Sequence, residues 1–283
     1  MAIKFGVNTW TWVSPFKTSD THLFSKIKHM GFDVVELAVE DPTLIDGRTV
    51  AARLWDLGLG ATVCGAFGPS RDLSSDDSAR VDESLEYIRA CLRLCQQVGC
   101  SVFAGPMYSS VGKARQLPRD ERKREWDRAV ANLKRAATLA DDHGVVLGLE
   151  PLNRFEIDMV NTHQQALSMM KAVGRKNVQI HLDTFHMNIE EKCVQTAIKA
   201  CKGRLCHIHA CENDRGTPGS GQVNWQGFAR GLKAAKYDGA VVIETFTPLV
   251  KEIAKAAAIW RPLASSQDAL ARDGVKFLKK LLK

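Results

Sequence analysis

Four side chains that could bind a metal ion follow four separate apolar segments of the chain. Glu150 follows VVLGL, Asp183 follows VQIHL, His209 follows RLCHI and Glu244 follows AVVI. A buried carboxylate is costly to keep charged, and three carboxylates that converge would repel one another. A divalent metal ion would remove both costs. These residue types therefore predict a metal site, and the alternative interpretation is a chance polar residue at the end of each segment.

The predicted ligands offer carboxylate oxygen and imidazole nitrogen, but no thiolate. Oxygen-rich ligand sets suit Mn²⁺, Mg²⁺ or Co²⁺, whereas structural Zn²⁺ sites commonly contain cysteine. We therefore expect a divalent metal cofactor, with Mn²⁺ as the first choice and Co²⁺ or Mg²⁺ as alternatives.

The spacing of the four residues predicts that they meet at one end of a barrel. The intervals between them are 33, 26 and 35 residues, and each is close to the length of one strand plus one helix. In a parallel barrel this spacing places the four side chains on adjacent strands at the same C-terminal rim. The residues two positions earlier should fill the layer below, because side chains alternate along a strand. They are Gly148, His181, His207 and Val242.

Short apolar runs alternate with segments of helical periodicity along the whole chain. Residues 82–99 are an example, because Leu85, Ile88, Leu92 and Cys95 fall on one helical face. We expect an α/β fold, a (β/α)8 TIM barrel that forms a single domain over residues 1–283. A doubly wound sheet would usually show a Gly-rich first turn, and no GxGxxG motif follows Thr9. The eight expected strands begin at Ile3, Phe32, Leu59, Ser101, Val145, Val178, Arg204 and Ala240.

Further polar residues stand just beyond the predicted strand ends. Glu156 comes six residues after Glu150, His186 three after Asp183, and Arg215 six after His209. Each could be a solvated loop residue, but together Glu156, His186 and Arg215 predict a ring of groups that recognise hydroxyls or oxyanions. The segment 213–225 is rich in glycine and could cradle a phosphate, although an active-site loop explains it equally well.

The early strands offer weaker candidates for the same cavity. In NTWTW, Trp10 and Trp12 could form an aromatic wall at the rim or belong to the core. Glu36 and Cys64, which end the second and third predicted strands, could also line the cavity.

Composition limits the class of protein. The chain has 283 residues, a formal net charge of +7 and 45% hydrophobic residues, which suffice for a full core. Bases and acids are interleaved over residues 119–128, as on a solvated helix face, so we do not expect nucleic acid as a partner. We find no signal sequence, and no apolar stretch approaches the length of roughly 20 residues that spans a bilayer. We therefore expect a cytoplasmic protein that does not contact a membrane. The eight cysteines show no CxxC spacing, and Cys91 and Cys95 are most simply buried hydrophobic residues.

The segments GLEPLNRFE, HLDTFHMNIEE, HIHACENDRGTPGSGQVNW and VVIETF resemble those of the D-tagatose/D-psicose (allulose) 3-epimerases, within the xylose isomerase-like barrel superfamily. The resemblance implies that Glu150, Asp183, His209 and Glu244 are the metal ligands, and that Glu150 and Glu244 are also the acid and base. It implies substrate contacts for Glu156, His186 and Arg215, and a small-residue pocket position for Cys64. It also implies a homo-oligomer, either a homodimer or a homotetramer.

Such an enzyme would invert C3 of a free ketose, which could be tagatose or sorbose, fructose or psicose, or a ketopentose. The C3 proton is a weak acid, so a metal on O2 and O3 would stabilise the cis-enediolate. Inversion requires one base to take the proton and another to return it to the opposite face. The alternatives are a related sugar isomerase acting on hydroxypyruvate or on an aldose–ketose pair, an inosose dehydratase, and an endonuclease IV-like DNA-repair enzyme. A non-catalytic sugar-binding barrel is a further alternative.

Overall fold

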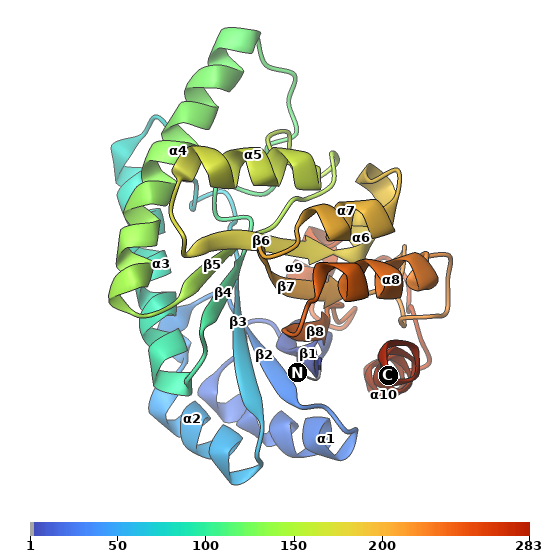
Figure 1. Cartoon of the computed structure of the whole chain (residues 1–283). Helices are drawn as coiled ribbons and strands as arrows, with labels where there is room; N and C mark the ends of the chain where they lie inside the picture. The colour runs from blue at the N-terminus through green and yellow to red at the C-terminus, as the bar shows by residue number, and fades with distance from the viewer. Residues whose placement is uncertain (1–2) are drawn as a thin grey trace.

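The computed structural model describes residues 3–283 of the chain. Eight parallel strands close into a barrel in sequence order, and β8 pairs with β1 (Figure 1). The strands are β1 Lys4–Asn8, β2 Val34–Val39, β3 Gly60–Gly65, β4 Val102–Gly105, β5 Val146–Leu149, β6 Val178–Asp183, β7 Leu205–Ala210 and β8 Ala240–Ile243. The predicted (β/α)8 TIM barrel is confirmed. Each strand begins in the segment expected to form it, and β2 runs one residue beyond its segment, to Val39.

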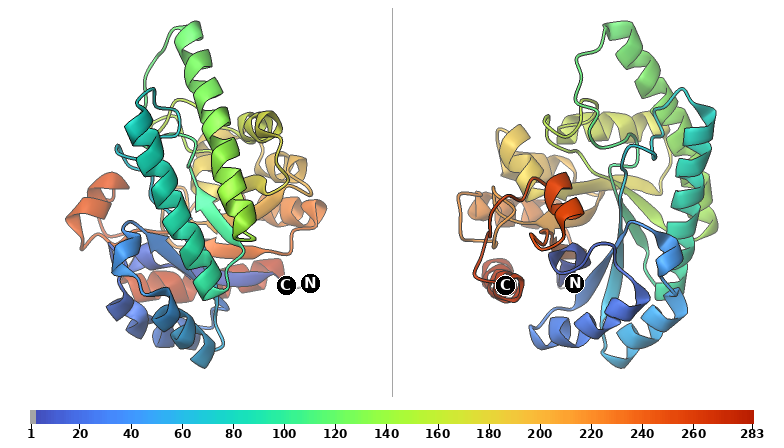
Figure 2. Two further views of the ribbon diagram at one scale, coloured as in Figure 1. Left: turned by 90° about the vertical axis from the view of Figure 1, so that its left-hand side faces the viewer. Right: turned by 180° about the vertical axis from the view of Figure 1, so that it is seen from behind.

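Helices follow the strands and cover the outside of the barrel (Figure 1). The two longest, α3 and α4, lie side by side along one flank (Figure 2). The helices are α1 Leu23–His29, α2 Gly47–Asp56, α3 Ser78–Val98, α4 Arg119–Asp142, α5 His163–Val173, α6 Thr184–Glu190, α7 Val194–Ala200, α8 Trp225–Ala235, α9 Lys251–Ala256 and α10 Gln267–Leu282.

Helix α3 illustrates how local sequence sets the limits of an element. The Asp77 side chain accepts a hydrogen bond from the Ala79 N–H and caps the N-terminus. Gly99 ends the helix in the left-handed conformation with φ 70°, which costs glycine little. The four predicted core positions, Leu85, Ile88, Leu92 and Cys95, are all buried.

The register of the barrel brings the predicted site residues onto one level. His181 of β6 lies opposite His207 of β7, and two residues further on Asp183 lies opposite His209. In the layer of side chains below the C-terminal rim, His181, His207 and Val242 are all buried. The alternation expected from the sequence is therefore confirmed for this part of the barrel.

The surface helix and the cysteines agree with the sequence interpretation. Lys123 and Asp127 pair one turn apart on α4, as expected for a solvated helix face. Cys91 and Cys95 are free, fully buried thiols in the core. Within residues 3–283, no helix combines the length and the apolar character needed to cross a bilayer.

Candidate active site

A cavity of about 450 Å³ opens at the C-terminal ends of the strands. Its two sides differ in chemistry, because charged groups come mainly from the later strands and apolar groups largely from the earlier ones. The charged and polar side is formed by Glu150, Glu156, His186, Arg215 and Glu244. The apolar side includes Trp10, Cys64, Phe67, Val111, Leu152, Phe246 and Ile253. A small polyhydroxy molecule could be bound with its reactive part on the charged side.

The ends of β5 to β8 position the four predicted ligands. Glu150 directly follows β5, Asp183 is the last residue of β6, His209 lies in β7 and Glu244 directly follows β8. All four side chains are buried. Because these strands are neighbours in the barrel, the four side chains converge as the sequence predicted.

His209 lies at the centre of this group. Its Nδ1 atom is 3.2 Å from Oε1 of Glu244 and 3.9 Å from Oε1 of Glu150. Possible ligand atoms of Glu150, Asp183 and His209 all lie within 4.8 Å of one another. His209 Nδ1 is buried and has no hydrogen-bond partner with good geometry. An orphaned imidazole nitrogen among carboxylates suits a divalent metal ion, so these buried groups could hold one.

Arg215 supplies a fixed positive charge beside the carboxylates. Its Nη1 atom donates to Oε2 of Glu244 at 2.6 Å and to Oδ2 of Asp183 at 3.2 Å. The guanidinium also lies over the rings of Phe185 and Phe246, at 4.1 and 4.9 Å from their centroids. Arg215 has a φ of 67°, and Thr245 Oγ1 donates to its carbonyl oxygen, so the loop holds this residue in a strained conformation.

The two glutamates have opposite electrostatic surroundings. Burial raises the pKa of Glu150 well above its usual value, and the nearby charges of Glu244 and Asp183 raise it further. Burial also acts to raise the pKa of Glu244, but His209 and Arg215 outweigh it and hold that pKa below its usual value. Burial likewise raises the pKa of Asp183, despite the charge of Arg215. The cluster is therefore asymmetric, with Glu244 the better stabilised anion.

His186 and Glu156 complete the polar side of the cavity. The Asn153 backbone N–H donates to Nδ1 of His186 at 3.0 Å, so a neutral His186 carries its proton on Nε2. That Nε2 atom is 3.9 Å from Oε1 of Glu150. Glu156 Oε1 accepts from the Asn153 side chain at 2.8 Å and lies 3.7 Å from Arg215. The structure thus brings His186, Glu156 and Arg215 together at the cavity, as predicted.

The two tryptophans of NTWTW lie in different places. Trp10 lines the cavity and packs against Phe246, with 5.4 Å between the ring centroids. Trp12 does not line it, because its indole N–H donates to Asp268 of α10 at 2.6 Å. The reason is local: Thr9–Thr11 form a 3₁₀ turn, in which residues two apart point in different directions, unlike in a strand. The proposed sugar wall at this position is therefore Trp10 rather than Trp12.

Of the two weaker candidates, Cys64 lines the cavity and Glu36 does not. Glu36 is not at a strand end, because β2 continues to Val39. Its side chain lies inside the barrel and is fully buried.

Two contributors to the site were not identified from the sequence. Phe246 continues the alternation Val242, Glu244, Phe246 past the end of β8, and this period of two could have revealed it. Glu212 is fully buried and organises the glycine-rich loop. Its carboxylate accepts from the N–H groups of Gly219 and Val223 and from the Trp225 indole at 2.6 Å. Nothing in its local sequence distinguishes Glu212 from a solvated loop acid.

Comparison with known proteins agrees with this architecture over the whole chain. A probable ketose 3-epimerase of Synechocystis sp. is 36% identical over 277 residues, covering 98% of this chain and 96% of that protein. The L-ribulose 3-epimerase of Mesorhizobium japonicum is 32% identical, covering 97% of this chain and 93% of that protein. The crystal structure of D-allulose 3-epimerase from Methylomonas sp. in complex with D-allulose matches with a TM-score of 0.91 at 29% identity, covering 99% and 97% of the two chains.

The sequence profile of one protein family also matches this chain. It matches residues 24–281, which include all four strand-end residues and the loops that carry Glu156, His186 and Arg215. Together with the closed barrel and the relatives above, this match shows that the chain belongs to the xylose isomerase-like TIM barrel family.

Proposed function

We propose that this protein is a metal-dependent ketose 3-epimerase, an isomerase that inverts the configuration at C3 of a free ketose. The observation that carries the proposal is the placement of two buried carboxylates, Glu150 and Glu244, around His209 at the base of one cavity. The relatives with this fold that are named ketose, L-ribulose and D-allulose 3-epimerases support it. We further propose that residues 1–283 act as one catalytic domain.

Glu150, Asp183, His209 and Glu244 would hold the divalent ion, which we propose to be Mn²⁺, with Co²⁺ or Mg²⁺ as alternatives. When bound, this ion would stabilise negative charge on O2 and O3 of the ketose. One of the two glutamates would remove the C3 proton from its own face of the sugar, and the other would return a proton to the opposite face. The configuration of the incoming ketose decides which of Glu150 and Glu244 acts as the base.

The surrounding residues would orient the sugar. Arg215 keeps Glu244 and Asp183 in place through its two hydrogen bonds, and its charge suits the oxygens near the reacting carbon. His186 Nε2–H and the Glu156 carboxylate are a donor and an acceptor for sugar hydroxyls. Trp10, Phe246 and Cys64 would pack against the C–H groups of the chain.

The glycine-rich loop favours an unphosphorylated substrate. Its inward-pointing N–H groups, which could have cradled a phosphate, instead donate to Glu212 at 2.8 Å from Gly219 and 3.2 Å from Val223. A carboxylate of the protein therefore already occupies the position where this loop would bind an anion. The N–H groups of Gly219 and Val223 are therefore not free to bind a phosphate of the substrate.

The test is a panel of fructose, psicose, tagatose, sorbose and the ketopentoses, compared with their 1- and 6-phosphates in the presence of Mn²⁺. We expect the larger kcat/KM for free ketoses. A consistent large preference for the phosphates would contradict the assignment. A metal-dependent product other than the C3 epimer would favour an isomerase or a dehydratase of the same family instead. The cytoplasmic location and the assembly into two or four copies stay predictions from the sequence.

A further inference from the structure

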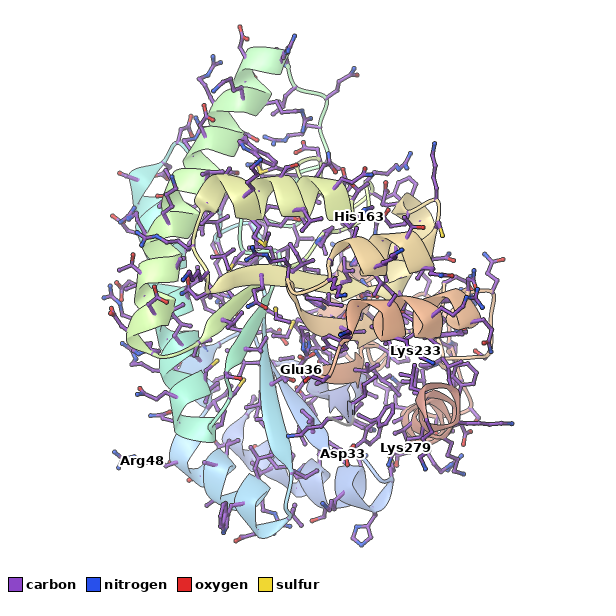
Figure 3. All side chains as sticks on the ribbon, in the orientation of Figure 1. Asp33, Glu36, Arg48, His163, Lys233 and Lys279 are labelled. Carbon is purple, nitrogen blue, oxygen red and sulfur yellow. The ribbon has the colours of Figure 1, made fainter. Side chains whose placement is uncertain are left out.

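Glu36 is a fully buried carboxylate beneath the cavity, with no contact to the space where a sugar would bind. It lies on β2, near the middle of the molecule in Figure 3, and its side chain is fully buried. It does not line the cavity, so it cannot touch a substrate held there. A buried charge that plays no part in substrate binding requires another explanation.

Four side chains surround this carboxylate. Oε1 accepts from the Asn8 side-chain amide at 3.0 Å, and Oε2 accepts from the Thr62 hydroxyl at 2.9 Å. The remaining contacts are both with histidines of β7. Nε2 of His209 is 2.5 Å from Oε1, and Nε2 of His207 is 2.6 Å from Oε2. Because the Asn8 amide and the Thr62 hydroxyl both donate to it, the Glu36 carboxylate acts here as a hydrogen-bond acceptor.

The contact with His209 determines which nitrogen of its ring carries a proton. With Glu36 as the acceptor, the 2.5 Å contact requires a proton on Nε2 of His209. In the neutral ring, Nδ1 then has a free lone pair, and Nδ1 is the atom that faces Glu244 and Glu150. The Nε2 atom of the His209 ring thus contacts Glu36, whereas its Nδ1 atom faces Glu150 and Glu244.

We propose that Glu36 is a positioning residue that fixes the tautomer and ring orientation of His209, so that Nδ1 is presented to the metal ion. The inference rests on the proposed metal-dependent function. Carboxylates that accept from the second nitrogen of a ligating histidine raise the basicity of the ligand and hold its ring. Asn8 of β1 and Thr62 of β3 also donate to Glu36, but neither contacts the proposed metal ligand His209 in these hydrogen bonds.

The test compares variants of the same buried network by their affinity for Mn²⁺ alone, measured from the EPR signal of free Mn²⁺. Glu36→Met keeps the length of the side chain and removes every acceptor, so we expect affinity to fall about 10–100-fold. Glu36→Gln keeps one acceptor oxygen and should lie between Glu36→Met and the wild type. Thr62→Val is the matched control, because it removes a donor to the same carboxylate but leaves the contact with His209; its affinity should stay near the wild type.

A second measurement needs no variant and decides the matter if Glu36→Met does not fold. In ¹⁵N-histidine-labelled wild-type protein, NMR should find a slowly exchanging proton on Nε2 of His209, both metal-free and with Mg²⁺ bound. An unprotonated Nε2 would overturn the proposal, as would Glu36→Met with wild-type affinity or Thr62→Val with an equal loss. If the wild type itself bound no Mn²⁺, the proposed metal dependence would fail, while the NMR result would still report on the Glu36–His209 contact.

Discussion

Replacing the two glutamates one at a time, as Glu150→Gln and Glu244→Gln, tests the proposed proton transfer. Each substitution keeps the shape of the side chain and removes a group that can take and return a proton. Epimerisation should fall about 10²–10⁴-fold in each variant, which corresponds to about 3–5 kcal/mol of barrier. Both directions of the reaction should be affected, because each direction needs both groups.

The structure predicts that the two variants differ in stability without metal. Burial and the nearby carboxylates both raise the pKa of Glu150, so Glu150→Gln removes a group that is costly to charge and should keep or raise Tm. Glu244 accepts a 2.6 Å hydrogen bond from Arg215, and a neutral amide would weaken that charge-assisted bond by about 1–2 kcal/mol. Tm of Glu244→Gln should therefore fall by about 2–8 °C.

The assay is ¹H NMR of each variant with each C3 epimer in D₂O, with bound metal measured in the same samples. The surviving carboxylate can still remove and restore a proton on its own face, so each variant should exchange C3 deuterium into one epimer without inversion. The two variants should prefer opposite epimers. Glu252→Gln, on α9 at the same cavity, is the control for the loss of a carboxylate as such. Near wild-type inversion by either metal-loaded Gln variant would refute the two-carboxylate mechanism.

Two further predictions concern stability. Saturating Mn²⁺ at about 100 times its Kd should stabilise the fold by about 2.7 kcal/mol and raise Tm by about 5–10 °C relative to chelated protein; an unchanged melting curve by calorimetry would argue against a site in the folded state. Gly65→Ala should cost about 1–3 kcal/mol in urea unfolding, because its Cβ would lie 2.7 Å from Phe103 and 2.8 Å from Phe67, both buried. In Gly60→Ala of the same strand the nearest atom is 3.6 Å away, so that variant should lose much less, and equal losses would show that overpacking is not the cause.

The parts of the site that follow strand periodicity could be predicted from the sequence. Asp183 and His209 could be placed because a parallel barrel ends its strands on one level, and the structure pairs these two residues directly. Glu156 and Arg215 could be associated with the rim only as loop residues, since their orientation depends on contacts within the loops. An arginine at this position does not predict the φ of 67° that the structure shows for Arg215.

The misplaced residues lie where the backbone departs from the expected element. Trp12 was expected to share a face with Trp10, and the 3₁₀ turn at Thr9–Thr11 separates them. Glu36 was expected at a strand end, but β2 runs on through Leu37 to Val39, so the carboxylate lies one layer deeper. Hydrogen bonds between β2 and β7, such as that of Glu36 with His209, join residues 173 apart and depend on barrel closure. No local pattern encodes them.

The central claim, that this protein inverts C3 of a free ketose by exchanging its proton, is tested most directly by wild-type turnover in D₂O. Mn²⁺-loaded protein is incubated with each free ketohexose and ketopentose, and the sugars are analysed by ¹H and ¹³C NMR. The account predicts that at least one ketose is converted to its C3 epimer, with solvent deuterium at C3 and none at C1. Formation of an aldose, deuterium at C1, or no C3 epimer from any of the ketoses would contradict it.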